Sequence, residues 1–177
     1  MKRLLLMRHG KSSWRDKTLA DFDRPLKHRG ERAALQMGKF LQSQSCVPSL
    51  IISSSAERAQ ATARLVLSVL PEQTELELCD DLYHALPKTI LRVIQQANDR
   101  HDTLLIVGHN PGLQELVFQW SGEAVDFTTA AVAHFEFPVD RWSELKLNLN
   151  QPFTHFWKPK ELDREATDAP NQNESSL

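Results

Sequence analysis

The chain is short of several residue types, and each shortage excludes a class of protein. Only two of its 177 residues are cysteines, Cys46 and Cys79, and they stand far apart. We therefore expect no disulfide framework, and a reducing cytoplasm suits such a chain. The formal net charge at pH 7 is -2. A protein that holds nucleic acid by bulk charge is strongly basic, so we expect no nucleic-acid partner.

Long hydrophobic runs are also absent. The apolar run at residues 4–7 is too short for the hydrophobic region of a signal peptide, and Arg8 interrupts it. No stretch is long and apolar enough to span a bilayer. The sequence therefore predicts a cytoplasmic protein without membrane contact, and its length suits one domain with a sizeable core.

Several motifs of phosphate and metal chemistry are missing. The chain has no phosphate-binding loop of the G-x-x-x-x-G-K-[ST] type and no H-E-x-x-H pair. The cysteine phosphatase pattern fails, because Ile52 and Ala85 stand where an arginine would follow Cys46 and Cys79. Carboxylates and histidines show no two-metal spacing. We expect neither a metal nor a cofactor.

Short apolar runs alternate with segments of helical periodicity. The predicted strands are 2–7, 50–53, 74–79 and 103–108, with a final pair at 130–137 and 143–149. The predicted helices are 30–42, 54–70, 87–99 and 113–121. Ser54 or Ser55 would cap the second helix, Pro71 would end it, Pro87 would open the third, and Gly122 would cap the end of the fourth.

This alternation predicts a three-layer α/β/α sandwich with a mostly parallel central sheet. We expect a single domain over residues 1–157. Residues 158–177 are polar and charged and contain two prolines. They predict a flexible C-terminal tail.

Arginines and histidines stand at three predicted strand ends. The first strand ends in Arg8-His9-Gly10, Arg58 lies in the first turns after the second, and His109 follows the fourth. A lone histidine at a strand end is more often structural, but in a parallel sheet these residues meet at one edge. Arginine grips phosphoryl oxygens and histidine acts as nucleophile or proton donor. The cluster therefore predicts a phosphoryl site, which Gly10 would let the backbone approach closely.

The segments that carry these residues resemble the histidine phosphatase superfamily. "LLLMRHG", "IISSSAERAQATA" and "LLIVGHNPGL" are similar to its three motifs. The resemblance implies that His9 becomes phosphorylated and that Arg8, Arg58 and His109 complete the catalytic set. The short chain, with "DFDRPLKHRG" and "DFTTAAVAHFEF", looks most like the SixA-type phosphohistidine phosphatases, which have a phosphoglycerate mutase-like fold.

The resemblance implies a phosphatase that removes phosphate from phosphohistidine in a signalling protein. The residues expected to bind substrate are Gly10, Lys11, Ser12, Arg24 and Asn110. Two alternatives stay open: a phosphatase for small phosphorylated metabolites, and a non-catalytic scaffold that binds a phosphorylated ligand. The sequence does not indicate an oligomeric state.

The chain departs from the family pattern in two places. Arg15 follows Trp14 where the mutase-like branch has an asparagine. The mutase-like and acid-phosphatase branches use a carboxylate as general acid, and here only Asp80 and Asp81 stand near that place. A weak acid suits a leaving group that departs readily, as a phosphorylated imidazole does. His84 follows the third predicted strand, and we expect it at the pocket rim.

Overall fold

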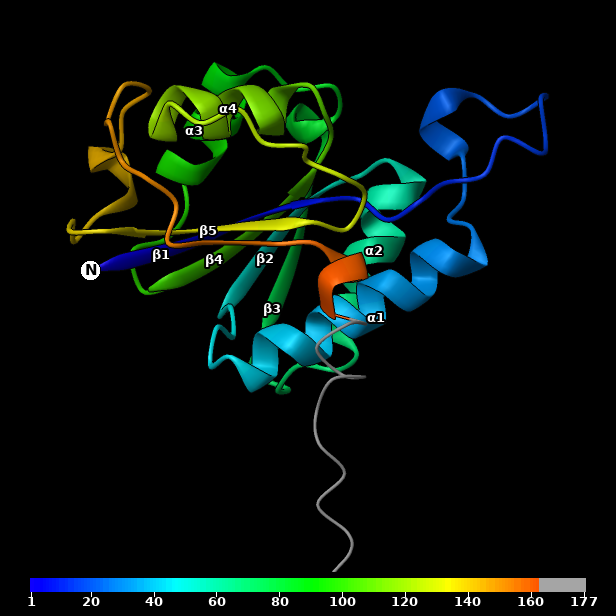
Figure 1. The fold of residues 1–177 in the computed structure, drawn as a ribbon, viewed down its shortest axis with the longest axis horizontal. Coiled ribbons are helices and arrows are strands. Elements are labelled where there is room, and N and C mark those ends of the chain that lie inside the picture. The colour runs from blue at the N-terminus through cyan, green and yellow to red at the C-terminus, as the bar shows by residue number, and fades with distance from the viewer. Residues whose placement is uncertain (163–177) are drawn as a thin grey trace, which may run out of the picture.

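The computed structural model describes residues 1–162 and contains a six-stranded sheet with the order β3-β2-β4-β1-β5-β6 (Figure 1). The strands are β1 (Lys2–Arg8), β2 (Leu50–Ser54), β3 (Glu75–Cys79), β4 (Thr103–Gly108), β5 (Val132–Phe137) and β6 (His155–Trp157). The helices are α1 (His28–Ser43), α2 (Glu57–Leu67), α3 (Pro87–Gln95) and α4 (Gly112–Ser121). Three short 3₁₀ turns are η1 (Asp21–Asp23), η2 (Asp80–Leu82) and η3 (Trp142–Glu144).

The register of the sheet brings the predicted site residues to one edge. Strands β1 to β4 pair in parallel, and β5 and β6 are antiparallel to their neighbours. Arg8 at the end of β1 lies opposite Gly108 at the end of β4, and Ser53 of β2 lies opposite Val107. Ser54, the last residue of β2, therefore lies near His9 and His109, which directly follow β1 and β4. The prediction of a mostly parallel sheet is confirmed.

Helices cover both faces of the sheet. Figure 1 shows α3 and α4 on one face and α1 and α2 on the other. In β1, Leu4 and Leu6 belong to the core under α3 and α4, whereas Leu5 and Met7 belong to the core under α1 and α2. A strand buried on both sides is apolar at every position, which explains the continuous run at residues 4–7. The three-layer sandwich is confirmed.

The predicted helix boundaries are partly right. Pro87 opens α3, and Gly122 ends α4 with a φ of 73°. The predicted cap of α2 is wrong, because Ala56 is the residue before the helix and no side chain caps it. The hydroxyls of Ser54 and Ser55 instead contact His109 and Asp80. Helix α2 ends at Leu67, ahead of Pro71.

The prediction of a strand at residues 143–149 is wrong. The segment begins within η3 and then pairs with no strand. Leu145, Leu147 and Leu149 all pack against the core under α3 and α4. The alternation of leucines with polar residues therefore arises because every second residue of this loop is at least partly buried, and not because the segment pairs as a strand. The second antiparallel strand is β6, whose residues pair with Val132 to His134 of β5.

The predicted division into a domain and a tail stays a prediction. Of the predicted tail, residues 163–177 lie outside the described residues. Leu162, within the described part, is buried against the core under α1 and α2. Across residues 1–162, no helix has the length and apolar character needed to cross a membrane.

Candidate active site

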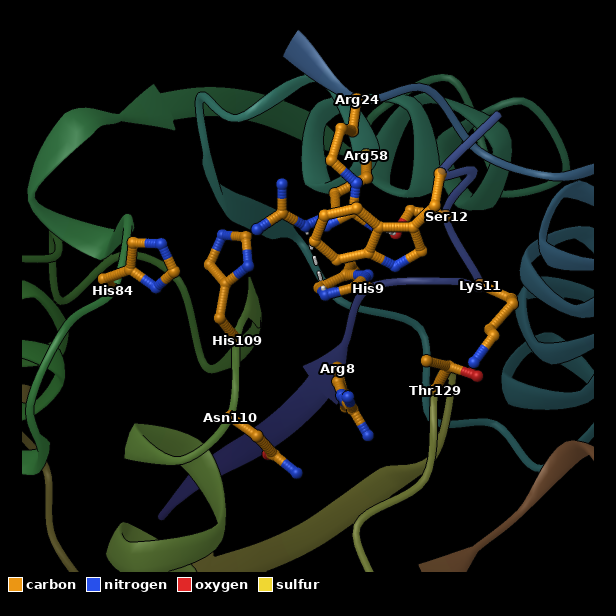
Figure 2. Close-up of a pocket in the computed structure, with 11 residues that line it drawn as sticks. Arg8, His9, Lys11, Ser12, Arg24, Arg58, His84, His109, Asn110 and Thr129 are labelled. Carbon is orange, nitrogen blue, oxygen red and sulfur yellow. Dashed lines mark hydrogen bonds between the residues drawn. The ribbon is translucent and has the colours of Figure 1, made fainter. Parts of the chain in front are cut away.

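A pocket of about 220 Å³ opens where β1, β2 and β4 end (Figure 2). It is smaller than the roughly 300–1,000 Å³ typical of sites for drug-sized ligands. Its walls contain three arginines, one lysine and three histidines. The lining residues are Arg8, His9, Lys11, Ser12, Trp14, Arg24, Arg58, His84, His109, Asn110 and Thr129. Such a cationic pocket suits a compact anion.

The His9 ring is fixed in one tautomer. Its Nδ1 lies 2.7 Å from the carbonyl oxygen of Gly10. A carbonyl only accepts, so Nδ1 carries the hydrogen and Nε2 of the neutral ring holds a free lone pair. Burial and the charges of Arg58, Arg8 and Arg24 lower the pKa of His9 to about 4, although the hydrogen bond to Gly10 opposes this shift. His9 is therefore neutral at pH 7, with Nε2 able to act as a nucleophile.

Arg58 reaches the pocket from the first turn of α2. Its Nε lies 3.4 Å from Nε2 of His9 and donates towards that lone pair. The other end of the guanidinium binds Asp21, with Nη1 2.5 Å from the backbone oxygen and Nη2 3.0 Å from Oδ2. Only 3 % of Arg58 is exposed. The side chain is thus held in one position, with its Nε–H directed at the place where a group on His9 would lie.

His109 stands beside His9, with ring centroids 5.0 Å apart. Its Nε2 lies 2.9 Å from the hydroxyl of Ser54, and its buried Nδ1 has no hydrogen-bond partner within residues 1–162. Burial, together with the nearby His9 and Arg58, lowers the pKa of His109 to about 3. Ser54 Oγ already accepts from the backbone N–H of Ala56, so its hydroxyl proton is available to Nε2. Nδ1 would then carry a hydrogen that an anion can accept.

Arg8 and Asn110 are tied to the same backbone carbonyl. Nη1 of Arg8 and Nδ2 of Asn110 each donate to the oxygen of Phe127 at 3.0 Å. Within the described chain, the buried Nε of Arg8 has no partner. An unpaired buried donor is costly, and an anion in the pocket would satisfy it.

The remaining predicted residues divide into two groups. Lys11, Ser12 and Arg24 line the pocket as expected, and Arg24 donates to the Ser12 hydroxyl at 2.5 Å. Gly10 is not among the lining residues. A Cβ on Gly10 would lie 2.8 Å from the backbone oxygen of Gly30 in α1. Its missing side chain therefore lets the loop pack on α1, and its contact with a ligand stays a prediction.

Asp21 organises the site and was not among the residues selected from the sequence. Its side chain accepts hydrogen bonds from Arg24 at 2.8 Å, Tyr83 at 2.8 Å and Arg58 at 3.0 Å. Nε2 of His84 lies 3.4 Å away. Although burial opposes ionisation, these hydrogen bonds hold the pKa of Asp21 well below its ordinary value. The sequence offered a weak signal, since Asp21 stands three residues before Arg24 in the "DFDRPLKHRG" segment.

The two candidate acids from the sequence do not line the pocket. Asp80 accepts from the hydroxyl of Ser55, and Asp81 lies 3.0 Å from Arg92 in α3. The pocket wall, as far as the described residues form it, contains no carboxylate. His84 does line the pocket, as predicted. Residues 1–162 also contain no group of three or more acidic, histidine or cysteine side chains able to hold a metal ion.

Comparisons with known proteins agree with this geometry. Residues 4–84 match the model of the histidine phosphatase superfamily, branch 1. An uncharacterized protein of Mycobacterium tuberculosis is 35% identical over 127 residues, which are 72% of this chain and 76% of that protein. A 2,3-bisphosphoglycerate-dependent phosphoglycerate mutase of Bifidobacterium longum is 31% identical over 91 residues, 48% of this chain and 37% of the mutase.

Solved structures show the same fold over most of the chain. A SixA structure from Agrobacterium tumefaciens superposes with a TM-score of 0.76 at 24% identity, covering 89% of this chain and 98% of that one. The protein histidine phosphatase SixA complexed with tungstate gives a TM-score of 0.75 at 24% identity, covering 90% and 99%. With the family model, the relatives and this fold in agreement, the chain belongs to the histidine phosphatase superfamily and is a phosphatase of it.

Proposed function

We propose that the protein hydrolyses phosphohistidine through a covalent phosphohistidine intermediate on its own His9. One observation carries the proposal: Nε2 of a neutral His9 faces a pocket that also contains Arg8, Arg58 and His109. A core gains nothing from gathering these cations and imidazoles, whereas a phosphoryl group would pair with all of them.

In the first step His9 Nε2 attacks phosphorus, the bond from phosphorus to the substrate's imidazole nitrogen breaks, and that imidazole leaves. The hydrogen bond from Nδ1 to the Gly10 carbonyl orients the ring and stabilises the positive charge that develops on it. A phosphoryl oxygen takes the place of Nε2 as the acceptor for Arg58 Nε–H. The unpaired Nε of Arg8 and Nδ1 of His109 supply further donors for the oxygens.

The second step is attack of water on phospho-His9. The same donors stabilise the charge on the phosphoryl oxygens, because these oxygens move little between the two displacements. Inorganic phosphate leaves, and His9 returns to its neutral form. Lys11, Ser12, Arg24 and Asn110 would contact the rest of the substrate or hold the donors in place.

The substrate class is supported by the chemistry of the pocket wall. No carboxylate among the lining residues stands ready to protonate a poor leaving group. A phosphorylated imidazole departs more readily than an alkoxide and makes the smallest demand on an acid. Tungstate, held in a SixA structure of the same fold, is a tetrahedral oxyanion like phosphate.

Labelling tests the proposal. We expect enzyme mixed with labelled phosphohistidine peptide and quenched in an alkaline denaturant to carry label on His9 that resists alkali and is lost in acid. His9→Ala should carry no label and have no activity. A parallel panel of sugar phosphates and aryl phosphates decides between protein and metabolite substrates. Turnover without a labelled intermediate, or full activity in His9→Ala, would contradict the mechanism, and binding without any turnover would favour the non-catalytic scaffold.

A further inference from the structure

The atom that leaves phosphorus when His9 attacks needs a proton. The pocket wall contains three histidines that could donate it. His9 is the attacking group of the proposed function. His109 is buried, its Nε2 contacts Ser54, and its lowered pKa keeps it neutral. His84 differs from both, because 57% of its side chain is exposed at the pocket mouth.

Asp21 and Tyr83 hold the His84 ring in place. Nε2 of His84 lies 3.4 Å from Oδ2 of Asp21, and the ring centroid lies 4.1 Å from that of Tyr83. The Tyr83 hydroxyl donates to the same carboxylate oxygen. When the His84 ring is protonated, its Nε2–H faces the Asp21 carboxylate at ion-pair distance, and the carboxylate can only accept. Nδ1 of His84 has no protein partner within residues 1–162 and is free to exchange a proton.

The position of His84 suits a group that acts opposite the nucleophile. Figure 2 shows His109 between His84 and His9, and the ring centroids lie 5.8 Å and 5.0 Å from that of His109. In an in-line displacement the leaving atom departs on the side of phosphorus opposite the attacking atom. A phosphoryl group bound at His109 would thus have His9 on one side and His84 towards the other.

We propose that His84, oriented by Asp21, donates the proton to the leaving atom. The inference rests on the proposed function. In the first step the Nε2–P bond forms on His9, the bond from phosphorus to the leaving atom breaks, and that atom takes the Nδ1 proton of the His84 imidazolium. In the second step water bonds to phosphorus, the P–Nε2 bond breaks, and Nδ1 of neutral His84 takes a proton from the water.

The groups that face His84 come from four segments. The carboxylate of Asp21 in η1 lies beside the ring, and the cation of Arg58 in α2 shares that carboxylate. His109 follows β4, and Tyr83 is the neighbouring residue. An imidazole donor also matches an imidazole leaving group, because proton transfer between two such rings is nearly balanced.

The test is a series of leaving groups measured with His84→Gln. For phenyl and alkyl phosphates we expect kcat/KM to fall by roughly 10²–10⁴-fold, the usual contribution of a general acid. For nitrophenyl phosphate, whose leaving group needs little protonation, we expect a far smaller loss. Added imidazole should restore part of the activity of His84→Ala on phenyl phosphate. His28→Gln is the matched control, because His28 is an exposed histidine paired with Glu31 at 3.2 Å.

Other results would separate this inference from the proposed function. An equal loss on every leaving group, without rescue by imidazole, would show that His84 only shapes the site. An unchanged variant would also overturn the inference. Both results leave the His9 intermediate standing. A wild-type enzyme that is inert on every phosphate and never labels His9 would overturn the proposed function, and the role of His84 with it.

Discussion

At the scale of single residues, the charged groups of the pocket are arranged around Asp21. Arg58 and Arg24 donate to different atoms of this residue, and Tyr83 and His84 approach the same oxygen. Arg58 and Arg24 are almost fully buried, so their positions depend on this carboxylate. A buried cation that loses its partner is costly, and it moves towards other acceptors.

Replacement of Arg58 tests the donor nearest His9, the proposed nucleophile. Arg58→Ala should reduce kcat by about 10²–10³-fold, the usual loss for one preorganised donor. Arg58→Lys should also be poor, because an ammonium cannot contact His9 and both acceptors of Asp21 with a planar fork. Steady-state kinetics on nitrophenyl phosphate measures both. Arg64→Ala, an exposed residue of the same helix bound to Gln60, should retain activity. A lysine variant of near wild-type kcat/KM would contradict the assigned geometry.

Replacement of Asp21 tests whether it positions Arg58. Asp21→Asn keeps the shape but removes the charge, so Arg58 should shift towards the pocket and away from its productive place. We expect kcat to fall by about 10–10²-fold, because a small displacement of a catalytic group reduces the rate by such a factor. KM should stay level or decrease, because the freed cation attracts the phosphate more strongly. Asp16→Asn, an exposed carboxylate bound to Thr18 in the same loop, is the control. A rise in KM with kcat unchanged would contradict the positioning role.

At the scale of elements, close backbone contacts set where the site loops lie. Gly10 packs on Gly30 of α1, and Gly112 at the start of α4 packs on Ala85. The second contact joins α4 to the segment that contains Tyr83 and His84. His84 itself has a φ of 50°, a left-handed conformation that non-glycine residues adopt rarely. The segment is therefore held in an uncommon backbone shape by its neighbours.

Gly112→Ala tests this contact between α4 and the His84 segment. The new Cβ would stand 1.9 Å from the backbone oxygen of Ala85, so the segment must move. We expect a loss of about 1–3 kcal/mol in the free energy of unfolding, as overpacking usually causes. Activity on phenyl phosphate should fall more than activity on nitrophenyl phosphate. In Gly108→Ala the nearest atom would stand 3.6 Å away, so stability should change little. Equal losses in the free energy of unfolding of the two variants would contradict a close contact between Gly112 and Ala85.

At the scale of the whole molecule, burial of two neutral histidines links folding to pH. The pKa of His9 is about 4 and that of His109 about 3, both below the ordinary histidine value of 6.5. Between pH 4 and pH 6.5 the two histidines bind more protons in the unfolded chain than in the folded chain. Stability therefore decreases as the pH falls from about 6.5 towards 4.

Urea unfolding at pH 7 and pH 4 measures this linkage. The shift of His9 corresponds to a loss on the order of 3 kcal/mol between these two pH values. In His9→Asn the difference between the two pH values should shrink by about that amount. His28→Asn, which removes an exposed histidine paired with Glu31, is the control. If the free energy of unfolding changes equally with pH in His9→Asn and in the wild type, then the pKa of His9 does not differ between the folded and unfolded chains as inferred.

The sequence by itself determined the layers, the parallel sheet and the place of His9, Arg8, Arg58 and His109. These follow from local patterns, because a doubly buried strand is apolar at each position and parallel strands end at one edge. The tertiary structure alone decided that Asp21 joins Arg58 to His84 and that Asp80 and Asp81 point elsewhere. It also placed β6 at 155–157 in preference to 143–149. Loop side chains and edge strands take their positions from contacts between distant segments, and such contacts leave no periodic signal in the chain.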